Sequence, residues 1–153
     1  MRGYCGIAIY HPLHGVNIGT LWRTAHSFGV DWLATIGRRY QRQASDTTDA
    51  GKHIPYYDYQ DFEDFYGNLP LGCQLVCVER ATNARSLITF EHPERAVYLL
   101  GAEDYGLPPH ILDTRLVIEI PNLHYCLNVS VAGAIVLYDR YLVKSRRILR
   151  EVK

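Results

Sequence analysis

One stretch of the chain, residues 116–133, constrains the fold more than any other. It reads LVIEIPNLHYCLNVSVAG, in which an apolar run ends at Pro121, a short polar loop follows, and Asn128 opens a series of small and apolar residues. This order predicts a buried strand, a loop and the start of a helix. In α/β proteins, ligands bind at the carboxyl ends of strands and near helix N-termini. We therefore expect the functional site at this junction.

Strand-like and helix-like segments alternate along the chain. Short apolar runs predict strands at residues 4–10, 32–36, 56–59, 74–78, 96–100 and 116–120. Helical patterns cover residues 17–28, 44–52, 61–66 and 128–144, the first between a cap at Asn17 and a stop at Gly29. This alternation predicts an α/β fold with a mostly parallel sheet and helices on both faces. The chain has 153 residues, so we expect a single domain, 1–153.

Charge is balanced, with 16 Lys and Arg against 16 Asp and Glu. This balance excludes the global positive field of a protein that coats nucleic acid, so any RNA contact must be local. The basic residues form two candidate patches: Arg38, Arg39 and Arg42, and then Lys144, Arg146, Arg147, Arg150 and Lys153. A solvated loop explains the first equally well, and cations that complement a helix C-terminus explain the second.

Cysteine usage points to a reducing compartment. The four cysteines, Cys5, Cys73, Cys77 and Cys126, show neither CxxC spacing nor a disulfide-dense pattern. We therefore expect free thiols, no zinc or other metal site, and a cytoplasmic protein. No apolar run reaches membrane-spanning length and the N-terminus does not resemble a signal peptide, so we expect no membrane contact.

A second loop of interest lies at residues 99–108, LLGAEDYGLP. A strand that runs into a loop with two glycines lets the backbone come close to a ligand. By itself such a sequence is more often a simple turn than a binding site. Two further motifs of the chain make a binding site the better interpretation.

Three motifs together resemble the SpoU/TrmH RNA methyltransferases of the SPOUT superfamily. Residues 17–29, NIGTLWRTAHSFG, resemble the family pattern Asn-x-Gly-x-x-x-Arg-x-Ala-x-x-Phe-Gly. The loop at 99–108 resembles Leu-Gly-x-Glu-x-x-Gly-Leu, and residues 118–130 resemble an Ile-Pro strand end followed by Ser-Leu-Asn-Val-Ser. The motifs occur in the family's order over nearly the whole chain.

This resemblance implies a C-terminal trefoil knot whose loops hold S-adenosylmethionine. It also implies transfer of the methyl group to a ribose 2′-hydroxyl of RNA. The implied catalytic residues are Asn17, Arg23, Glu103 and Asn128. The implied cofactor contacts are Val78, Gly101, Ile120, Cys126 and Leu127. RNA contacts are assigned to Arg38, Arg39, Arg42, Lys144, Arg146 and Arg147.

Arg23 is the residue to which family accounts assign proton removal. A guanidinium has a pKa above about 12 and is a poor proton acceptor, so we favour clamping of phosphate and stabilisation of the developing alkoxide. Arg23 lies away from the apolar stripe of its helix, where a solvated surface arginine is the ordinary explanation without the motif.

Cys126 stands where the family usually has serine, and a thiol is a weaker hydrogen-bond partner than a hydroxyl. We interpret it as a small packed residue rather than a nucleophile. The first expected strand begins almost at Met1, so we expect no separate RNA-binding extension, as in the minimal, TrmL/YibK-like members of the family. Those members act as homodimers on the tRNA anticodon loop.

We expect the same assembly here. Val129, Ala132, Val136 and a Tyr138/Tyr141 edge lie on the last predicted helix, and Ala132 with Gly133 would permit close approach of a partner helix.

The functional hypothesis is a tRNA ribose 2′-O-methyltransferase that uses S-adenosylmethionine. Methylation of rRNA and a knotted RNA-binding protein without catalysis are the alternatives. Retention of the four implied catalytic residues argues against the silent binder. A Rossmann-like nucleotide binder is disfavoured because no GxGxxG or P-loop follows the first predicted strand.

Overall fold

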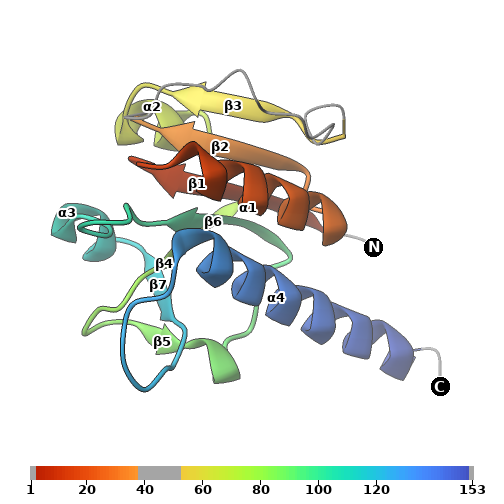
Figure 1. Ribbon diagram of the computed structural model, residues 1–153. Coiled ribbons are helices and arrows are strands. Elements are labelled where there is room, and N and C mark those ends of the chain that lie inside the picture. Colours follow the sequence, from red (N-terminus) through yellow and green to blue (C-terminus); the bar gives the residue numbers. More distant parts are fainter. Residues whose placement is uncertain (1–2, 38–52, 152–153) are drawn as a thin grey trace.

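The computed structural model describes residues 3–37 and 53–151 and contains a sheet of seven strands (Figure 1). The strand order is β3-β2-β1-β6-β4-β7-β5, and every neighbouring pair is parallel. The strands are β1 (Tyr4–Tyr10), β2 (Trp32–Ile36), β3 (Tyr56–Tyr59), β4 (Gln74–Val78), β5 (Arg85–Ser86), β6 (Arg95–Leu100) and β7 (Leu116–Glu119). The helices are α1 (Gly15–Ser27), α2 (Phe62–Gly67), α3 (Pro109–Leu112), α4 (Val129–Glu151) and the 3₁₀ turn η2 (Leu87–Thr89). This arrangement confirms the predicted fold class.

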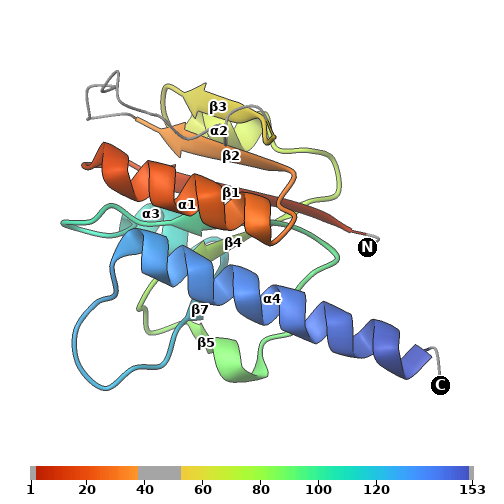
Figure 2. The same ribbon diagram turned by 45° about the vertical axis from the view of Figure 1, so that its right-hand side comes forward.

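Central strands are buried on both faces because helices cover both sides of the sheet. In β1, Ile7 and Ile9 face one apolar cluster and Ala8 faces the other. Helices α1 and α4 lie side by side on the first face, as Figures 1 and 2 show, while Phe65 of α2 and Ile111 of α3 pack in the second cluster. The prediction of helices on both faces is therefore confirmed.

Gly133 shows how closely α4 approaches the sheet. A Cβ atom at this position would lie 2.5 Å from Leu21 of α1 and 3.1 Å from Leu100 of β6. Val129 and Val136 are also buried in the same cluster. The expectation that Gly133 and these valines meet a partner helix is therefore wrong, because they are used to pack α4 within its own chain.

The predicted cap at Asn17 and the predicted helix start at Asn128 have different outcomes. Asn128 does cap α4, since its Oδ1 accepts hydrogen bonds from the amides of Ser130 at 2.9 Å and Val131 at 3.4 Å. Asn17 is not a cap, because α1 begins two residues earlier at Gly15 and the side chain of Asn17 points into a tertiary network. The stop at Gly29 is confirmed, with a left-handed φ of 67°.

The remaining predictions mostly match the structure. Asp61 caps α2, and β3 lies at the edge of the sheet. Strand β7 ends one residue earlier than expected, and α4 extends past residue 144 to Glu151. The predicted helix at 44–52 lies outside the described residues. Elements β5, η2 and α3 were not predicted, because they contain only 2, 3 and 4 residues and are too short for a periodic pattern.

Candidate functional site

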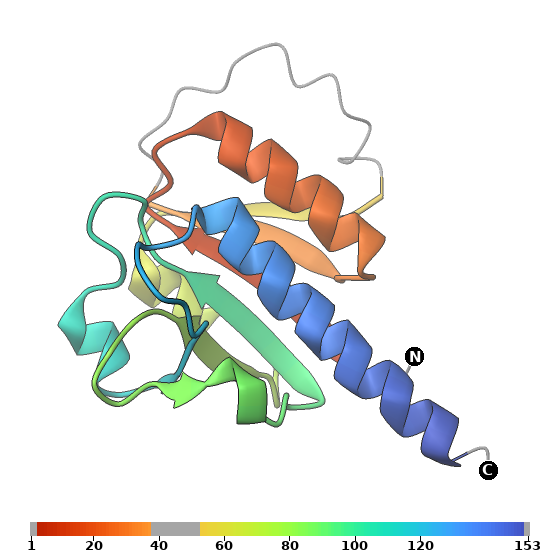
Figure 3. The same cartoon turned by 60° about the horizontal axis from the view of Figure 1, so that its bottom comes forward.

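A cavity of about 570 Å³ opens where the carboxyl ends of β1, β4, β6 and β7 meet the first turn of α4. Its volume is typical of small-molecule sites in proteins. Figure 3 shows the loops after β6 and β7 together at this edge, beside the start of α4. The lining comes mainly from these loops: Val78, Glu79, Arg80, Leu100, Gly101, Ala102, Glu103, Asp104, Tyr105, Gly106, Ile120, Asn122, Cys126, Leu127 and Asn128, with His14, Asn17, Val129 and Ala132.

A polar network joins the three motifs at this cavity. The Nδ2 of Asn17 donates to Glu103 Oε1 at 2.5 Å, and the Nδ2 of Asn128 donates to Asn17 Oδ1 at 3.1 Å. The other carboxylate oxygen of Glu103 accepts from the backbone amide of Leu13 at 2.6 Å. Asn17 is buried, whereas Asn128 is exposed at the cavity. Three of the four predicted catalytic residues are thus in direct contact.

The glycine-rich loop after β6 closes one wall of the cavity. Ala102 and Gly106 exchange backbone hydrogen bonds of 3.1 and 2.9 Å, so the loop folds back on itself. Gly106 has a left-handed φ of 71°, which favours glycine. A Cβ at Gly101 would lie 2.7 Å from the carboxylate of Glu79. Both glycines are therefore needed for the backbone to approach this carboxylate.

Glu79 and Arg80 line the cavity but were not predicted from the sequence. Glu79 Oε2 accepts from the amide of Leu107 at 3.0 Å. The Arg80 guanidinium donates to the carbonyls of Asn122 at 3.0 Å and His124 at 3.2 Å. The segment after β7 is thereby tied to the segment after β4, in the C-terminal region where the family resemblance places the knot. Charged residues directly after a buried strand were the available signal, because that is where α/β sites form.

All five predicted cofactor residues line the cavity, namely Val78, Gly101, Ile120, Cys126 and Leu127. Val78 is buried, and the Cys126 thiol is exposed. The interpretation of Cys126 as a packed residue is therefore wrong, because the loop after β7 leaves its side chain at the surface of the cavity. Val78, Ile120 and Leu127 provide apolar walls, while the glycine loop offers backbone groups. Such a mixture suits a ligand with one flat apolar part and several polar groups.

Arg23 is not brought to the cavity of its own chain. It is exposed on α1, six residues after Asn17, which is about 9 Å further along the helix axis. Its position off the apolar stripe is confirmed. Within one chain Arg23 is thus not among the residues that line the cavity with Asn17, Glu103 and Asn128, because six residues also turn its side chain to another side of the helix.

The predicted RNA contacts lie elsewhere. Arg38, Arg39 and Arg42 fall outside the described residues. Arg146 and Arg147 are exposed near the C-terminal end of α4, which projects beyond the sheet (Figure 1). Lys144 is sixteen residues from Asn128, or about 24 Å along the helix. Its Nζ donates to the carbonyl of Glu94 at 3.3 Å, and partial burial lowers the pKa of Lys144. Lys144 thus already has a contact with its own chain.

Two kinds of feature are absent from residues 3–37 and 53–151. None of the helices there combines the length and apolar character needed to cross a membrane. No group of three or more His, Cys, Asp or Glu side chains in those ranges is arranged to hold a metal ion.

The known proteins that this chain resembles are RNA methyltransferases. Residues 5–138 match the profile of the SpoU rRNA Methylase family. The tRNA (guanosine(18)-2′-O)-methyltransferase of Escherichia coli K12 is 25% identical over 129 residues, which cover 80% of this chain and 56% of that protein. The chain therefore spans about half the length of the curated relatives that it matches.

Solved structures show the same fold. A protein studied for 2-OH methylation of C/U34 on tRNA superposes with a TM-score of 0.80 at 25% identity, covering 92% of this chain and 96% of that one. An AdoMet-bound rRNA methyltransferase from Sinorhizobium meliloti gives a TM-score of 0.78 at 24% identity, covering 91% of this chain and 56% of that one. Each of these structures has the same fold as this chain, a parallel sheet flanked by helices.

Proposed function

The chain belongs to the SpoU rRNA methylase family, and from that premise we propose that it transfers a methyl group from S-adenosylmethionine to a ribose 2′-hydroxyl of RNA. The observation that carries the proposal is the Asn17–Glu103–Asn128 network at the mouth of the cavity. It joins residues from all three motifs, which are 86 and 111 positions apart in pairs. Packing alone gives no reason for such a network to lie beside a cavity of ligand size.

The residues of the cavity fit the proposed cofactor. Leu100, Ile120 and Leu127 can enclose an adenine ring, and the loop from Gly101 to Gly106 lines the cavity with backbone groups that can meet the polar groups of a ligand. S-adenosylmethionine, when bound, supplies a methyl group on an electrophilic sulfonium centre. The protein must then align the acceptor and help its hydroxyl lose a proton.

We assign the alignment to the motif network. Asn128 is exposed at the cavity while its Oδ1 is held by the α4 amides and its Nδ2 by Asn17. This side chain is therefore held in one orientation before substrate binds, which lowers the entropy cost of alignment. Glu103 holds Asn17 and the Leu13 amide, so we assign it a positioning role rather than direct proton removal.

Arg23 remains our candidate for contact with RNA phosphate and the developing alkoxide. Because it lies outside the cavity of its own chain, it requires RNA that extends along α1 or a second protomer that brings it to the partner's cavity. The exposed side chains Val131, Tyr138 and Tyr141 on α4 support a homodimer through this face. Light scattering at micromolar concentration should give the mass of a dimer. A monomeric mass would exclude a second protomer, and Arg23 could then act only on RNA that extends along α1.

We propose tRNA as the substrate, with the anticodon loop as the region modified. The support is the 96% coverage of the structure studied for methylation of C/U34 on tRNA, together with the match to a tRNA-modifying relative. Arg146 and Arg147 would contribute to RNA binding outside the cavity. The chain would then act as a minimal member of the family, in the cytoplasm.

The decisive experiment compares nucleosides from cells with and without this protein. Mass spectrometry of purified tRNA and rRNA should show one 2′-O-methylated nucleotide missing from tRNA and restored by the purified protein with S-adenosylmethionine. A loss confined to rRNA would move the substrate to the ribosome. An unchanged nucleoside profile, together with retained RNA binding, would favour the RNA-binding protein without catalysis.

A further inference from the structure

Glu79 lies in the wall of the cavity but belongs to none of the three motifs. Its two carboxylate oxygens accept one backbone amide each, from Leu107 at 3.0 Å and from Arg80 at 3.0 Å. An ionised carboxylate can accept about four hydrogen bonds, so two acceptor positions remain for a ligand. The carboxylate is also pressed against the glycine loop, since a Cβ at Gly106 would lie 2.3 Å from Oε2. Its position is therefore well defined.

The negative charge of Glu79 has no ion-pair partner among the described residues. The nearest candidate in sequence is Arg80, whose guanidinium instead donates to the carbonyls of Asn122 and His124 and to the Asn122 side chain. The carboxylate of Glu103 already accepts hydrogen bonds from the side-chain amide of Asn17 and the backbone amide of Leu13. A cation that enters this cavity therefore meets a fixed and unneutralised carboxylate at Glu79.

We propose that Glu79 is a selectivity residue that favours the cationic cofactor over its neutral product. The inference rests on the proposed function, because methyl transfer converts a positively charged sulfonium into a neutral thioether, S-adenosylhomocysteine. A nearby carboxylate attracts the first ligand and is indifferent to the charge of the second. Inside a partly enclosed cavity this attraction is screened less than in bulk water. Glu79 thus favours binding of fresh cofactor in competition with the spent product.

The test is calorimetric titration of the intact protein and its Glu79→Gln variant with three ligands. These are S-adenosylmethionine, S-adenosylhomocysteine and sinefungin, in which a protonated amine replaces the sulfonium centre. Glutamine keeps the size of the side chain and removes its charge. We expect Glu79→Gln to weaken both cationic ligands by about tenfold while the neutral product changes by about twofold or less, as a single charge contact predicts.

Glu91→Gln provides a matched control, because it makes the same change at an exposed carboxylate that does not line the cavity. It should leave the ratio of the affinities for cofactor and product unchanged. Equal weakening of all three ligands in Glu79→Gln would mean that Glu79 only shapes the loop, and this would overturn the proposal. An unchanged ratio in Glu79→Gln, or the same change of ratio in Glu91→Gln, would overturn it too.

Failure of the inference is separable from failure of the proposed function. If the intact protein binds S-adenosylmethionine but Glu79→Gln does not alter the ratio, only the selectivity role is lost. If the intact protein binds none of the three ligands, the proposed cofactor itself is wrong. Thermal unfolding of both variants, read by circular dichroism, ensures that the proteins compared are folded.

Discussion

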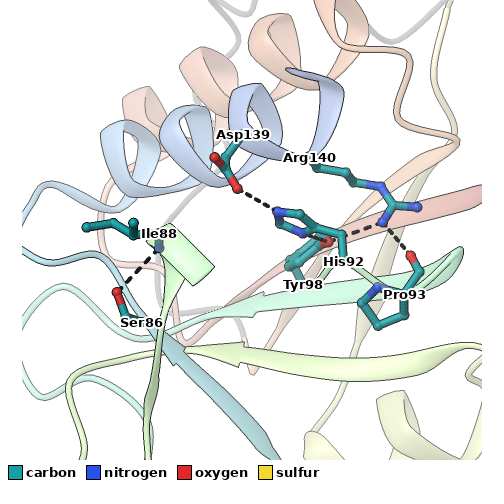
Figure 4. Close-up of polar contacts among 7 residues, drawn as sticks. All are labelled: Ser86, Ile88, His92, Pro93, Tyr98, Asp139 and Arg140. Carbon is teal, nitrogen blue, oxygen red and sulfur yellow. Dashed lines mark hydrogen bonds and ion pairs between the residues drawn. The ribbon is translucent and has the colours of Figure 1, made fainter. Parts of the chain in front are cut away.

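Two polar networks hold α4 at different points along its length, and they differ in how they use hydrogen-bonding capacity. At the N-terminal end, Asn128 joins Asn17 and Glu103 at the rim of a cavity. Further along the helix, Arg140 and Asp139 hold Tyr98 and His92 in the interior (Figure 4). The first network is open to a ligand, while the second is closed within the protein.

Four hydrogen bonds from one buried guanidinium form the centre of the closed network. Arg140 is 4% exposed, and its guanidinium donates to the carbonyls of Pro93 at 2.6 Å and Glu94 at 2.8 Å. It also donates to the hydroxyl of Tyr98 at 3.2 Å, which shares a hydrogen bond of 2.5 Å with His92 Nδ1. His92 Nε2 contacts Asp139 Oδ2 at 2.8 Å.

We infer that the closed network serves stability and that the open network serves the reaction. A buried guanidinium with several partners is costly to remove, because each partner then loses a hydrogen bond in the interior, where water cannot replace it. The open network keeps the exposed Asn128 in contact with the cavity, where a substrate can complete its bonds. Mutations in the closed network should therefore lower stability, and mutations on the functional side should lower rate.

The largest expected effect is that of Arg140→Ala. It removes the guanidinium that donates to the carbonyls of Pro93 and Glu94 and to the hydroxyl of Tyr98, and it leaves a cavity in the interior. The free energy of unfolding should therefore fall by about 3 kcal/mol or more. Urea unfolding followed by circular dichroism measures it. Arg146→Ala, on the exposed end of the same helix, is the control and should change stability by no more than about 0.5 kcal/mol. Equal effects would contradict the closed-network interpretation.

Arg23→Ala should have the largest effect on rate. Loss of one preorganised electrostatic donor should slow single-turnover methylation of tRNA by about a hundredfold, or about 2.7 kcal/mol, with little change in stability or cofactor affinity. Arg23→Lys should recover little, since an ammonium cannot reproduce the planar guanidinium. Wild-type rates in Arg23→Ala would remove Arg23 from the mechanism, and lost cofactor binding would make its role architectural.

The closed network also predicts a pH dependence. Burial lowers the pKa of His92, with Asp139 acting in the opposite direction, so the folded protein binds this proton less readily than the unfolded chain. Stability from this group is present above about pH 6.5 and declines as the pH falls below that value, by at most about 1.4 kcal/mol per pH unit. Unfolding measured between pH 8 and pH 5 should show a smaller decline in His92→Gln, and an identical decline would exclude His92 as the cause.

Asn128→Ala tests the open network directly. It removes the cap of α4, which should cost about 1 kcal/mol of stability, and it frees the Oδ1 of Asn17. The methylation rate should fall by more than this stability loss can explain, since the protein stays folded at 25 °C. Ser130→Ala is the control, because its hydroxyl contacts the same Asn128 oxygen without being part of the proposed site. Matching rates in the two variants would reduce Asn128 to a helix cap.

The smallest effect is expected for Cys126→Ser. The thiol lines the cavity and is exposed, so the substitution restores the family's usual hydroxyl with little change in volume. Turnover should be preserved and cofactor affinity unchanged or improved. Loss of turnover with intact folding and cofactor binding would indicate a thiol-dependent step, against our interpretation that Cys126 is not a nucleophile.

The sequence by itself determined the local elements of this protein. Strands β1, β2, β3 and β4, the cap at Asn128 and the stop at Gly29 follow from apolar periodicity and backbone chemistry, which act between near neighbours. The three motifs also indicated which loops would carry function, because the carboxyl ends of parallel strands meet at one edge of a sheet.

Only the tertiary structure decided which side chains meet. His92 and Asp139 are 47 positions apart, and Asn17 and Asn128 are 111 apart, so no local pattern relates them. The order of the strands placed Glu79 in the cavity wall and left Arg23 outside it. Gly133 suggested a partner helix in sequence, yet it serves the contact of α4 with Leu21 and Leu100. Local forces select elements, whereas long-range packing selects their neighbours.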